Sequence, residues 1–387
     1  MPEAPATGLT AHGKTATLAT VEEEEAVPIA EDHPLPARFP APPAARPSAP
    51  PASFRSRPMP NIPVTIALSE YDHVRDVLDG TVPVPGADLT VLRMPVEEIF
   101  YRFTFHREWD VSEMSFAKVV SLMSQGDETL VAIPVFVSRM FRHSSFYVRT
   151  DSGLTDPSQL AGKRIGVPEW AQTAAIYSRG IIAHHHGVDL ASIQWFQAGV
   201  NDPGRVEKVK LDLRGGLKLT PVPDRSLSEM LMAGDLDVVL SARPPGPFLA
   251  GNPGIRRLFA DYQSAEEQFL RDTGIFPIMH VVVMRRDVYD RNRWLALNLM
   301  KAFETAKDRS LARMSDITLS YFPVPWMAER ARTAREMIGG DGWPYGVDAN
   351  RATLDAFTTW AYEQGVCHRK LDPAEIFAPE TRSRFKV

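Results

Sequence analysis

Short apolar runs alternate with amphipathic stretches along most of the chain, and this pattern predicts strands and helices in turn. Residues 64–68, VTIAL, predict a buried strand that ends in a polar segment. The stretches 96–116 and 227–243 share one plan, an amphipathic helix followed by a polar turn, an aspartate and a short strand. A further unit at 163–183 predicts a strand and then a helix that begins at Pro168. Repeated units of this kind indicate an α/β fold with two lobes.

Two β-rich segments are predicted to connect the lobes. The run from Ile133 to Val148 leads out of the first lobe, and residues 276–283 lead back into it. The first lobe is therefore expected to be discontinuous, with helices at 293–314, 324–338 and 350–364 covering it after the return. The predicted division is a tail at 1–60, the first part of lobe 1 at 61–143, lobe 2 at 144–277, and the rest of lobe 1 at 278–387.

Residues 1–60 depart from this pattern. They hold 13 of the 33 prolines and an acidic run from Glu22 to Glu25, with almost no large aliphatic periodicity. Such a segment cannot bury enough apolar surface to offset the entropy lost on ordering. It is predicted to be a disordered tail, and order is predicted to begin at Ile62.

Composition narrows the class of partner. The 387 residues are 44% hydrophobic and 24% charged, with a formal net charge of -5 and no Lys/Arg-rich run. A nucleic-acid partner is therefore excluded, and a small molecule is expected instead. No apolar run reaches the length of a membrane span, so no membrane association is expected.

Cysteine content and the N-terminus bear on the compartment. Cys367 is the only cysteine, which excludes an internal disulfide and a cysteine-based zinc cluster and suits a reducing compartment. The N-terminal sequence lacks the basic-then-apolar plan of a secretory signal. These features predict a cytoplasmic protein.

Nine short pieces, spread from about residue 62 to the C-terminus, carry a resemblance to a known family. They are EMS at 113–115, IPVF at 133–136, RMFRH at 139–143, DSG at 151–153, LAGKRIGVPE at 160–169, SAR at 241–243, TGIFPIMH at 273–280, WPYG at 343–346 and FAPET at 377–381. Together they resemble the 4,5-dihydroxyphthalate decarboxylases, which have the type 2 periplasmic-binding-protein fold. The tail lies outside the resemblance.

The resemblance implies a two-lobed α/β protein whose central cleft holds a small anionic aromatic acid. The implied reaction removes one carboxylate from 4,5-dihydroxyphthalate, or from a related hydroxylated aromatic acid, and gives 3,4-dihydroxybenzoate and carbon dioxide without a cofactor. The alternative is a non-catalytic solute-binding protein for a small aromatic or aliphatic carboxylate. The lack of a secretion signal favours the enzyme, because a transport receptor needs export.

Such a reaction requires an acid near the ring carbon, an acceptor near the phenol and a cation on the retained carboxylate. The segment 139–143 offers cations and an aromatic ring. If it is extended, Arg139, Phe141 and His143 share one side and Arg142 takes the other. An arginine can hold a carboxylate by two parallel hydrogen bonds, and the phenyl ring can pack on an aromatic ligand. The competing interpretation is that these charges pair with acidic residues between the lobes.

Candidates for proton transfer are His143, His280 and Glu169. The histidine at 280 lies in the returning segment, so it is expected to meet the one at 143 across the cleft. Imidazole titrates near neutral pH, which suits proton transfer. It could instead be held by backbone hydrogen bonds. The glutamate opens the helix predicted after 163–167, where an ordinary first-turn charge is the alternative.

Further substrate-binding candidates follow predicted strands, where ligands bind in open α/β sheets. Arg243 is a second candidate for carboxylate binding, with a plain loop arginine as the alternative. Trp170 and Thr173 lie at a predicted helix start, whose free N–H groups attract anions. Tyr71 and Ser115 supply hydroxyl groups, and helix-start or core roles compete with this.

No metal site is predicted. His184, His185 and His186 are adjacent, so on a helix they point in different directions, and Gly187 places them at a helix C-terminus. Helix-rich C-terminal cover leaves room for a homo-oligomer.

Overall fold

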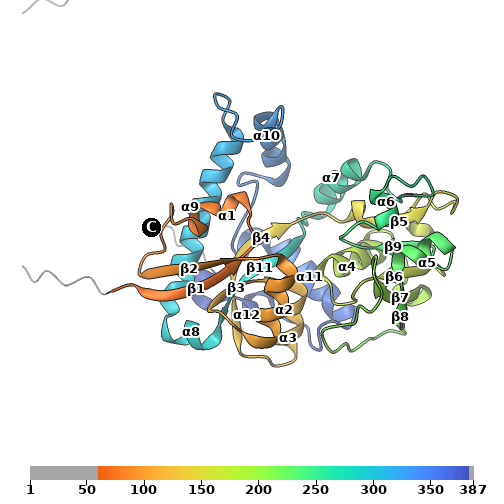
Figure 1. Ribbon diagram of the computed structural model, residues 1–387, viewed down its shortest axis with the longest axis horizontal. Helices are drawn as coiled ribbons and strands as arrows, with labels where there is room; N and C mark the ends of the chain where they lie inside the picture. Colours follow the sequence, from red (N-terminus) through yellow and green to blue (C-terminus); the bar gives the residue numbers. More distant parts are fainter. Residues whose placement is uncertain (1–59, 383–387) are drawn as a thin grey trace, which may run out of the picture. The chain divides into compact units, whose positions relative to one another are not determined.

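The computed structural model describes residues 60–382. The tail predicted at 1–60 lies outside the described residues, except for its last residue. Within the described part, eleven strands form two separate sheets with helices between them in sequence (Figure 1). The predicted α/β class is confirmed.

The five-stranded sheet has the order β2-β1-β3-β11-β4. Strands β1, β2 and β3 run parallel, whereas β11 is antiparallel to both β3 and β4. The bounds are β1 Ile62–Leu68, β2 Ala87–Arg93, β3 Val111–Ser115, β4 Leu130–Arg139 and β11 Ile278–Arg285.

The six-stranded sheet has the order β10-β5-β9-β6-β7-β8. Its parallel part is β9-β6-β7-β8, while β5 and β10 are antiparallel. The bounds are β5 Phe146–Arg149, β6 Arg164–Val167, β7 Gln194–Gly199, β8 Leu219–Ser226, β9 Val238–Leu240 and β10 Ile255–Arg257.

Helices connect and cover these strands. They are α1 Asp72–Leu78, α2 Val96–His106, α3 Phe116–Ser124, α4 Thr173–Gly180, α5 Leu227–Ala233, α6 Gly246–Leu249, α7 Tyr262–Thr273, α8 Arg286–Arg291, α9 Arg293–Ser315, α10 Met327–Ile338, α11 Arg351–Glu363 and α12 Pro373–Ile376. Shorter turns are η1 His143–Ser145, η2 Pro157–Leu160, the π-type η3 Ile181–His185, η4 Leu190–Ser192, η5 Asp348–Asn350 and η6 Pro379–Thr381. Among residues 60–382, no helix is long and apolar enough to cross a membrane.

Most of the predicted elements are confirmed. The strand predicted at 64–68 is part of β1, and the two repeated units form α2 with β3 and α5 with β9. The strands predicted for each lobe also fall into separate sheets, because β5 to β10 form one sheet and the remaining strands form the other. The residue boundaries of the lobes stay a prediction.

Two local predictions are wrong. The helix predicted from Pro168 begins only at Thr173, because the backbone N–H groups of Trp170 and Ala171 donate to Oε2 of Glu207, at 2.7 and 3.1 Å, outside any helical ladder. The segment 139–143 is also not extended throughout, since β4 ends at its first residue and η1 begins at its last. The strand alternation predicted for its side chains therefore does not apply.

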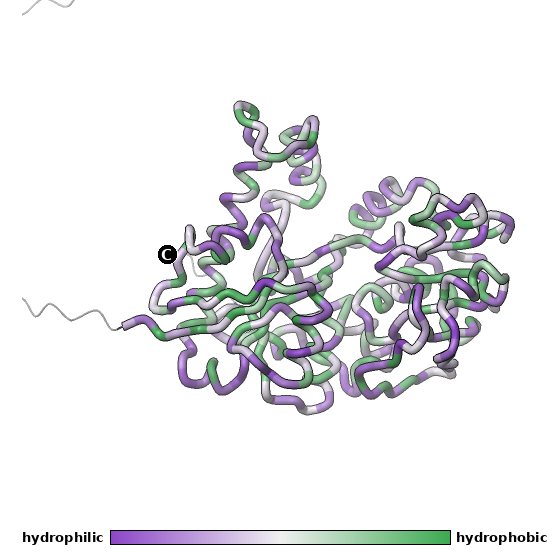
Figure 2. Tube along the Cα trace, in the orientation of Figure 1, coloured by the Kyte–Doolittle hydropathy of each residue, from purple (hydrophilic) through white to green (hydrophobic). Residues whose placement is uncertain are grey.

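The core follows the buried strands. All residues of β3 are buried, and so are nine of the ten residues of β4. Figure 2 shows hydrophobic residues gathered along the strands of the five-stranded sheet. The larger buried cluster continues from this sheet into the other, since it contains Ile66 of β1 as well as Val238 of β9.

Helix α11 contacts elements next to both sheets. The ring of Phe357 stacks on Phe116, which follows β3, with centroids 4.7 Å apart, and lies 4.9 Å from Tyr177 of α4. Just after the helix, the carbonyl of Gln364 accepts a hydrogen bond of 2.7 Å from Nε1 of buried Trp170. The two sheets are therefore joined by packing as well as by the chain.

Candidate active site

A cavity of about 310 Å³ collects residues that follow β3, β6, β7 and β9, together with α2 and the start of β11. Carboxyl ends of strands are the usual ligand sites in open α/β sheets, and the volume lies at the lower end for small-molecule sites. We call it the site cavity. Its polar and charged lining residues are Glu97, Thr104, Ser115, Lys118, Arg142, Glu169, Gln172, Thr173, Arg205, Lys208, Ser241, Arg243 and His280.

His280 is held by a buried carboxylate. Its Nδ1 lies 2.6 Å from Oε1 of Glu113, which is fully buried on β3. The hydroxyl of Tyr71 donates to the same oxygen at 2.5 Å, and the backbone N–H of Ser69 donates to Oε2 at 2.9 Å. Because Nδ1 is engaged, Nε2 is the ring nitrogen left for a molecule in the site cavity. This is the arrangement by which a carboxylate fixes the tautomer and orientation of a working histidine.

Tyr71 supports this pair from behind. Burial raises the pKa of its hydroxyl well above the usual value, and the charge of Glu113 raises it further. The phenol therefore stays a neutral hydrogen-bond donor. On the cavity side, the ring of Phe100 meets the edge of the His280 ring with centroids 4.8 Å apart. The histidine is thus fixed on one face and flanked by an apolar ring on the other.

Arg142 is a buried cation in the cavity wall. It is 7% exposed, and its Nε donates to Sδ of Met279 at 3.2 Å. Among the described residues, no carboxylate forms an ion pair with it. Burial lowers the pKa of its guanidinium to about 10, while attraction to Glu266 acts in the opposite direction. A buried, uncompensated arginine favours an anion in the cavity.

A second group of charges surrounds Glu169. Its carboxylate contacts Lys118 at 3.2 Å, Arg205 at 2.6 Å and Lys208 at 3.3 Å. Burial alone would raise the pKa of this carboxyl group, but the three cations outweigh it and hold the pKa below its usual range. Glu207 also takes part through Lys118, so three cations face two carboxylates. The group leaves a net positive charge beside the cavity.

Ser115 and Thr173 join the two sheets at the cavity. Their hydroxyl oxygens lie 3.0 Å apart, and Oγ1 of the threonine accepts a 3.0 Å hydrogen bond from the N–H of Ala117. Thr173 opens α4, so the positive end of that helix faces the same space. Glu97 of α2 and Arg243 after β9 form an exposed ion pair among the lining residues.

Five predicted site residues do not line the cavity, and one of them is Tyr71, which contacts His280 and Glu113 from behind. The guanidinium of Arg139 is buried and donates to the carbonyls of Phe276 and Pro344 at 2.8 and 2.6 Å, and to Asn350. Phe141 stacks on Phe276, and Trp170 is buried beside α11. His143 lies in a separate aromatic cluster, so it does not meet His280 across the cavity.

Several lining residues escaped the sequence analysis, among them Lys118, Arg205, Lys208 and Ser241. Glu113 also escaped it, although a glutamate inside the buried run VSEMS is a detectable signal, since a buried charge needs a partner. The cations offered no such signal, because long-range pairing with Glu169 is invisible in the sequence.

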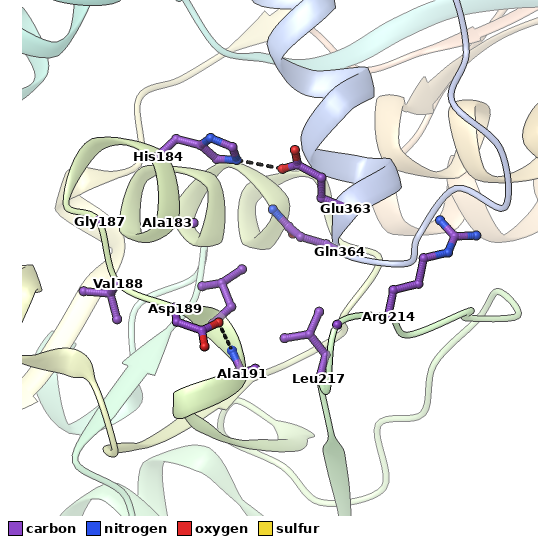
Figure 3. Close-up of a pocket in the computed structure, with 12 residues that line it drawn as sticks. Ala183, His184, Gly187, Val188, Asp189, Ala191, Arg214, Leu217, Glu363 and Gln364 are labelled. Carbon is purple, nitrogen blue, oxygen red and sulfur yellow. Dashed lines mark hydrogen bonds and ion pairs between the residues drawn. The ribbon is translucent and has the colours of Figure 1, made fainter.

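A second cavity of about 370 Å³ contains His184 and lies beside α11 (Figure 3). Its polar side chains are already engaged within the protein. His184 Nε2 lies 2.7 Å from Oε2 of Glu363, Asp189 accepts from the N–H of Ala191 at 2.9 Å, and Arg214 donates to the carbonyls of Tyr362, Cys367 and His368. Within residues 60–382, no group of three or more His, Cys, Asp or Glu side chains could hold a metal ion.

Comparison with known proteins gives two curated relatives. A 4,5-dihydroxyphthalate decarboxylase of Comamonas testosteroni is 37% identical over 330 residues, which are 85% of this chain and 100% of that protein. A protein of the same name from Pseudomonas putida is 35% identical over 214 residues, which are 55% of this chain and 83% of that protein. No family model matches the chain.

Among solved structures, the periplasmic sulfonate-binding protein of Methylobacillus flagellatus is similar in fold. The TM-score is 0.51 at 13% identity, over 83% of this chain and 92% of that one. This likeness confirms the periplasmic-binding-protein fold.

Proposed function

The chain belongs to the 4,5-dihydroxyphthalate decarboxylase family, and from this premise we propose that it removes one carboxylate from 4,5-dihydroxyphthalate. The products are 3,4-dihydroxybenzoate and carbon dioxide. The observation that carries the proposal is that one cavity holds both His280, backed by Glu113, and Arg142, a buried cation that forms no ion pair within residues 60–382.

Protonated His280 acts as the acid. A proton passes from Nε2 to the ring carbon that bears the departing carboxylate, while the hydroxyl para to that carbon donates electron density. The bond from the ring to the carboxylate then breaks, its electrons restore the aromatic ring, and carbon dioxide leaves. His280 regains a proton from water. Glu113 keeps the imidazole oriented and stabilises its charged form throughout.

Arg142 holds the carboxylate that is retained. A guanidinium can bind it through two parallel hydrogen bonds and so fix the ring in one plane. The cations around Glu169 attract the dianionic substrate to the cavity. The departing carboxylate lies on the side of Phe100, where an apolar wall disfavours its charge and favours loss of neutral carbon dioxide.

The test is to incubate the purified protein, stripped of metal by a chelator, with 4,5-dihydroxyphthalate and to detect 3,4-dihydroxybenzoate by chromatography. Stoichiometric release of both products is expected. Calorimetry in parallel measures substrate binding by the His280→Gln variant. Binding without product in the wild-type protein would contradict the decarboxylase and support a carrier of aromatic carboxylates. Activity that disappears on chelation and returns with one divalent ion would contradict the cofactor-free reaction.

A further inference from the structure

Two polar atoms in the wall of the site cavity have no partner in the described part of the protein. They are Oγ of Ser241, a residue 3% exposed, and Oε1 of Gln172. Both atoms are buried. A buried polar atom costs free energy unless it is hydrogen-bonded, so native proteins leave few of them unsatisfied. In the second cavity, by contrast, the polar side chains already have protein partners.

The chemistry of these atoms differs from that of the rest of the wall. The cations of the site cavity can only donate, and the carboxylates of Glu97 and Glu169 are occupied by cations. The amide oxygen of Gln172 accepts, and the hydroxyl of Ser241 both accepts and donates. A ligand that satisfies the amide oxygen must carry a hydrogen-bond donor, and a phenol hydroxyl is such a donor. A phenol hydroxyl can also donate to or accept from Ser241.

Their position follows from the six-stranded sheet. Gln172 comes after β6 and Ser241 after β9, and these strands are parallel neighbours with Gly166 opposite Val239. His280 belongs to the other sheet. In 4,5-dihydroxyphthalate each hydroxyl is para to one carboxylate, so the two hydroxyls share the edge of the ring opposite the two carboxylates. A ring with its carboxylates toward His280 thus directs its hydroxyls toward this pair.

We propose that Gln172 and Ser241 recognise the vicinal hydroxyls of the substrate and select it over phthalate, an inference that rests on the proposed function. Acceptance of a hydrogen bond from the hydroxyl para to the reacting carbon also increases electron donation into the ring. The pair therefore determines specificity for a catechol dicarboxylate.

The experiment measures dissociation constants by calorimetry for 4,5-dihydroxyphthalate, 4-hydroxyphthalate and phthalate. All variants are made in the full chain carrying His280→Gln, so that turnover does not disturb binding. The parent is expected to prefer the dihydroxy ligand. Gln172→Met and Ser241→Ala should each reduce that preference by roughly tenfold, because each removes one hydrogen bond, while affinity for phthalate stays unchanged.

Two matched controls separate recognition from general damage. Gln197→Met alters another buried glutamine with an unpartnered amide atom, and Ser178→Ala alters another buried serine, and neither residue lines the cavity. Both should keep the full preference. Unchanged preference in Gln172→Met and Ser241→Ala, or an equal loss for all three ligands, would overturn the inference. Product formation by the wild-type protein is scored separately, so failure of the reaction and failure of hydroxyl recognition are distinguishable.

Discussion

His280 and His143 carry the same imidazole ring but differ in their hydrogen-bond partners and in the groups around them. Nδ1 of His280 lies 2.6 Å from a buried carboxylate, and its ring borders a cavity. Nδ1 of His143 is buried and has no hydrogen-bond partner among residues 60–382. Its ring meets those of Phe259 and Phe269 at centroid distances of 5.0 and 5.2 Å.

The environment of His143 favours the neutral ring. Burial, together with repulsion from the neighbouring His186 and His185, lowers the pKa of His143 to about 3. A ring that stays neutral across the physiological range cannot supply a proton. A carboxylate partner and contact with the cavity therefore distinguish the acid from a histidine that serves packing.

The largest difference between the two histidines is expected when each imidazole is removed in turn. Replacement His280→Gln should lower kcat by at least about a hundredfold, because it removes the proton donor but keeps a polar side chain. His143→Leu should leave kcat within about twofold. Single-turnover kinetics with 4,5-dihydroxyphthalate measures both. Equal losses in the two variants would remove the distinction between the histidines.

Arg142 directly precedes His143 in the sequence, but it lines the same cavity as His280. We therefore expect it to affect substrate binding although its neighbour does not. Arg142→Met should weaken substrate binding by about tenfold to a hundredfold, because a desolvated charge pair is lost. The chemical step should be less affected. Calorimetry in the His280→Gln background provides the measurement, with exposed Arg243→Met as a control of small effect. Unaltered affinity would locate the carboxylate elsewhere.

Glu113 is the carboxylate partner of His280, and Nδ1 of His143 has no such partner among the described residues. We propose that Glu113 is a positioning residue. Glu113→Gln should lower kcat by about tenfold or more with little change in KM, because the imidazole loses the carboxylate that orients it. Glu113→Asp should restore part of the activity. A purely structural role would instead lower thermal stability without a selective loss of kcat, and Glu113→Asp would then restore none of it.

The last expected effect is on stability and not on turnover. The pKa of His143 is depressed in the folded state, so its neutral form is favoured there, and stability is complete above the unfolded value of about 6.5. As pH falls toward about 3, the unfolded chain binds the proton more readily and stability is lost. The loss should be roughly 3 kcal/mol between pH 6.5 and 4. Denaturant unfolding should show a flatter pH dependence in His143→Leu, and an identical slope would contradict this account.

The sequence was sufficient for the repeated strand–helix units, because apolar periodicity is a local signal. It also singled out His280, which lines the site cavity, and the role of this residue stays a prediction. It was not sufficient to choose between Arg139 and Arg142. That choice depends on β4 ending at residue 139, where the first arginine meets the carbonyls of Phe276 and Pro344. These partners are more than 130 residues away. Contacts of that range, like those of Glu113 with His280, arise only when the sheets assemble.

The packing of helix α11 affects which step of the proposed reaction limits turnover. Its buried contacts join elements of both sheets, and a Cβ atom at Gly180 of α4 would overlap the ring of Trp360, so the packing admits little relative movement. We therefore expect entry and exit to require rotation of the exposed Glu97 and Arg243 side chains, which line the cavity. Such rotations take picoseconds to nanoseconds, whereas domain closure takes microseconds to milliseconds. Product release is accordingly expected to be fast, which leaves breakage of the bond to the carboxylate as the step that limits turnover.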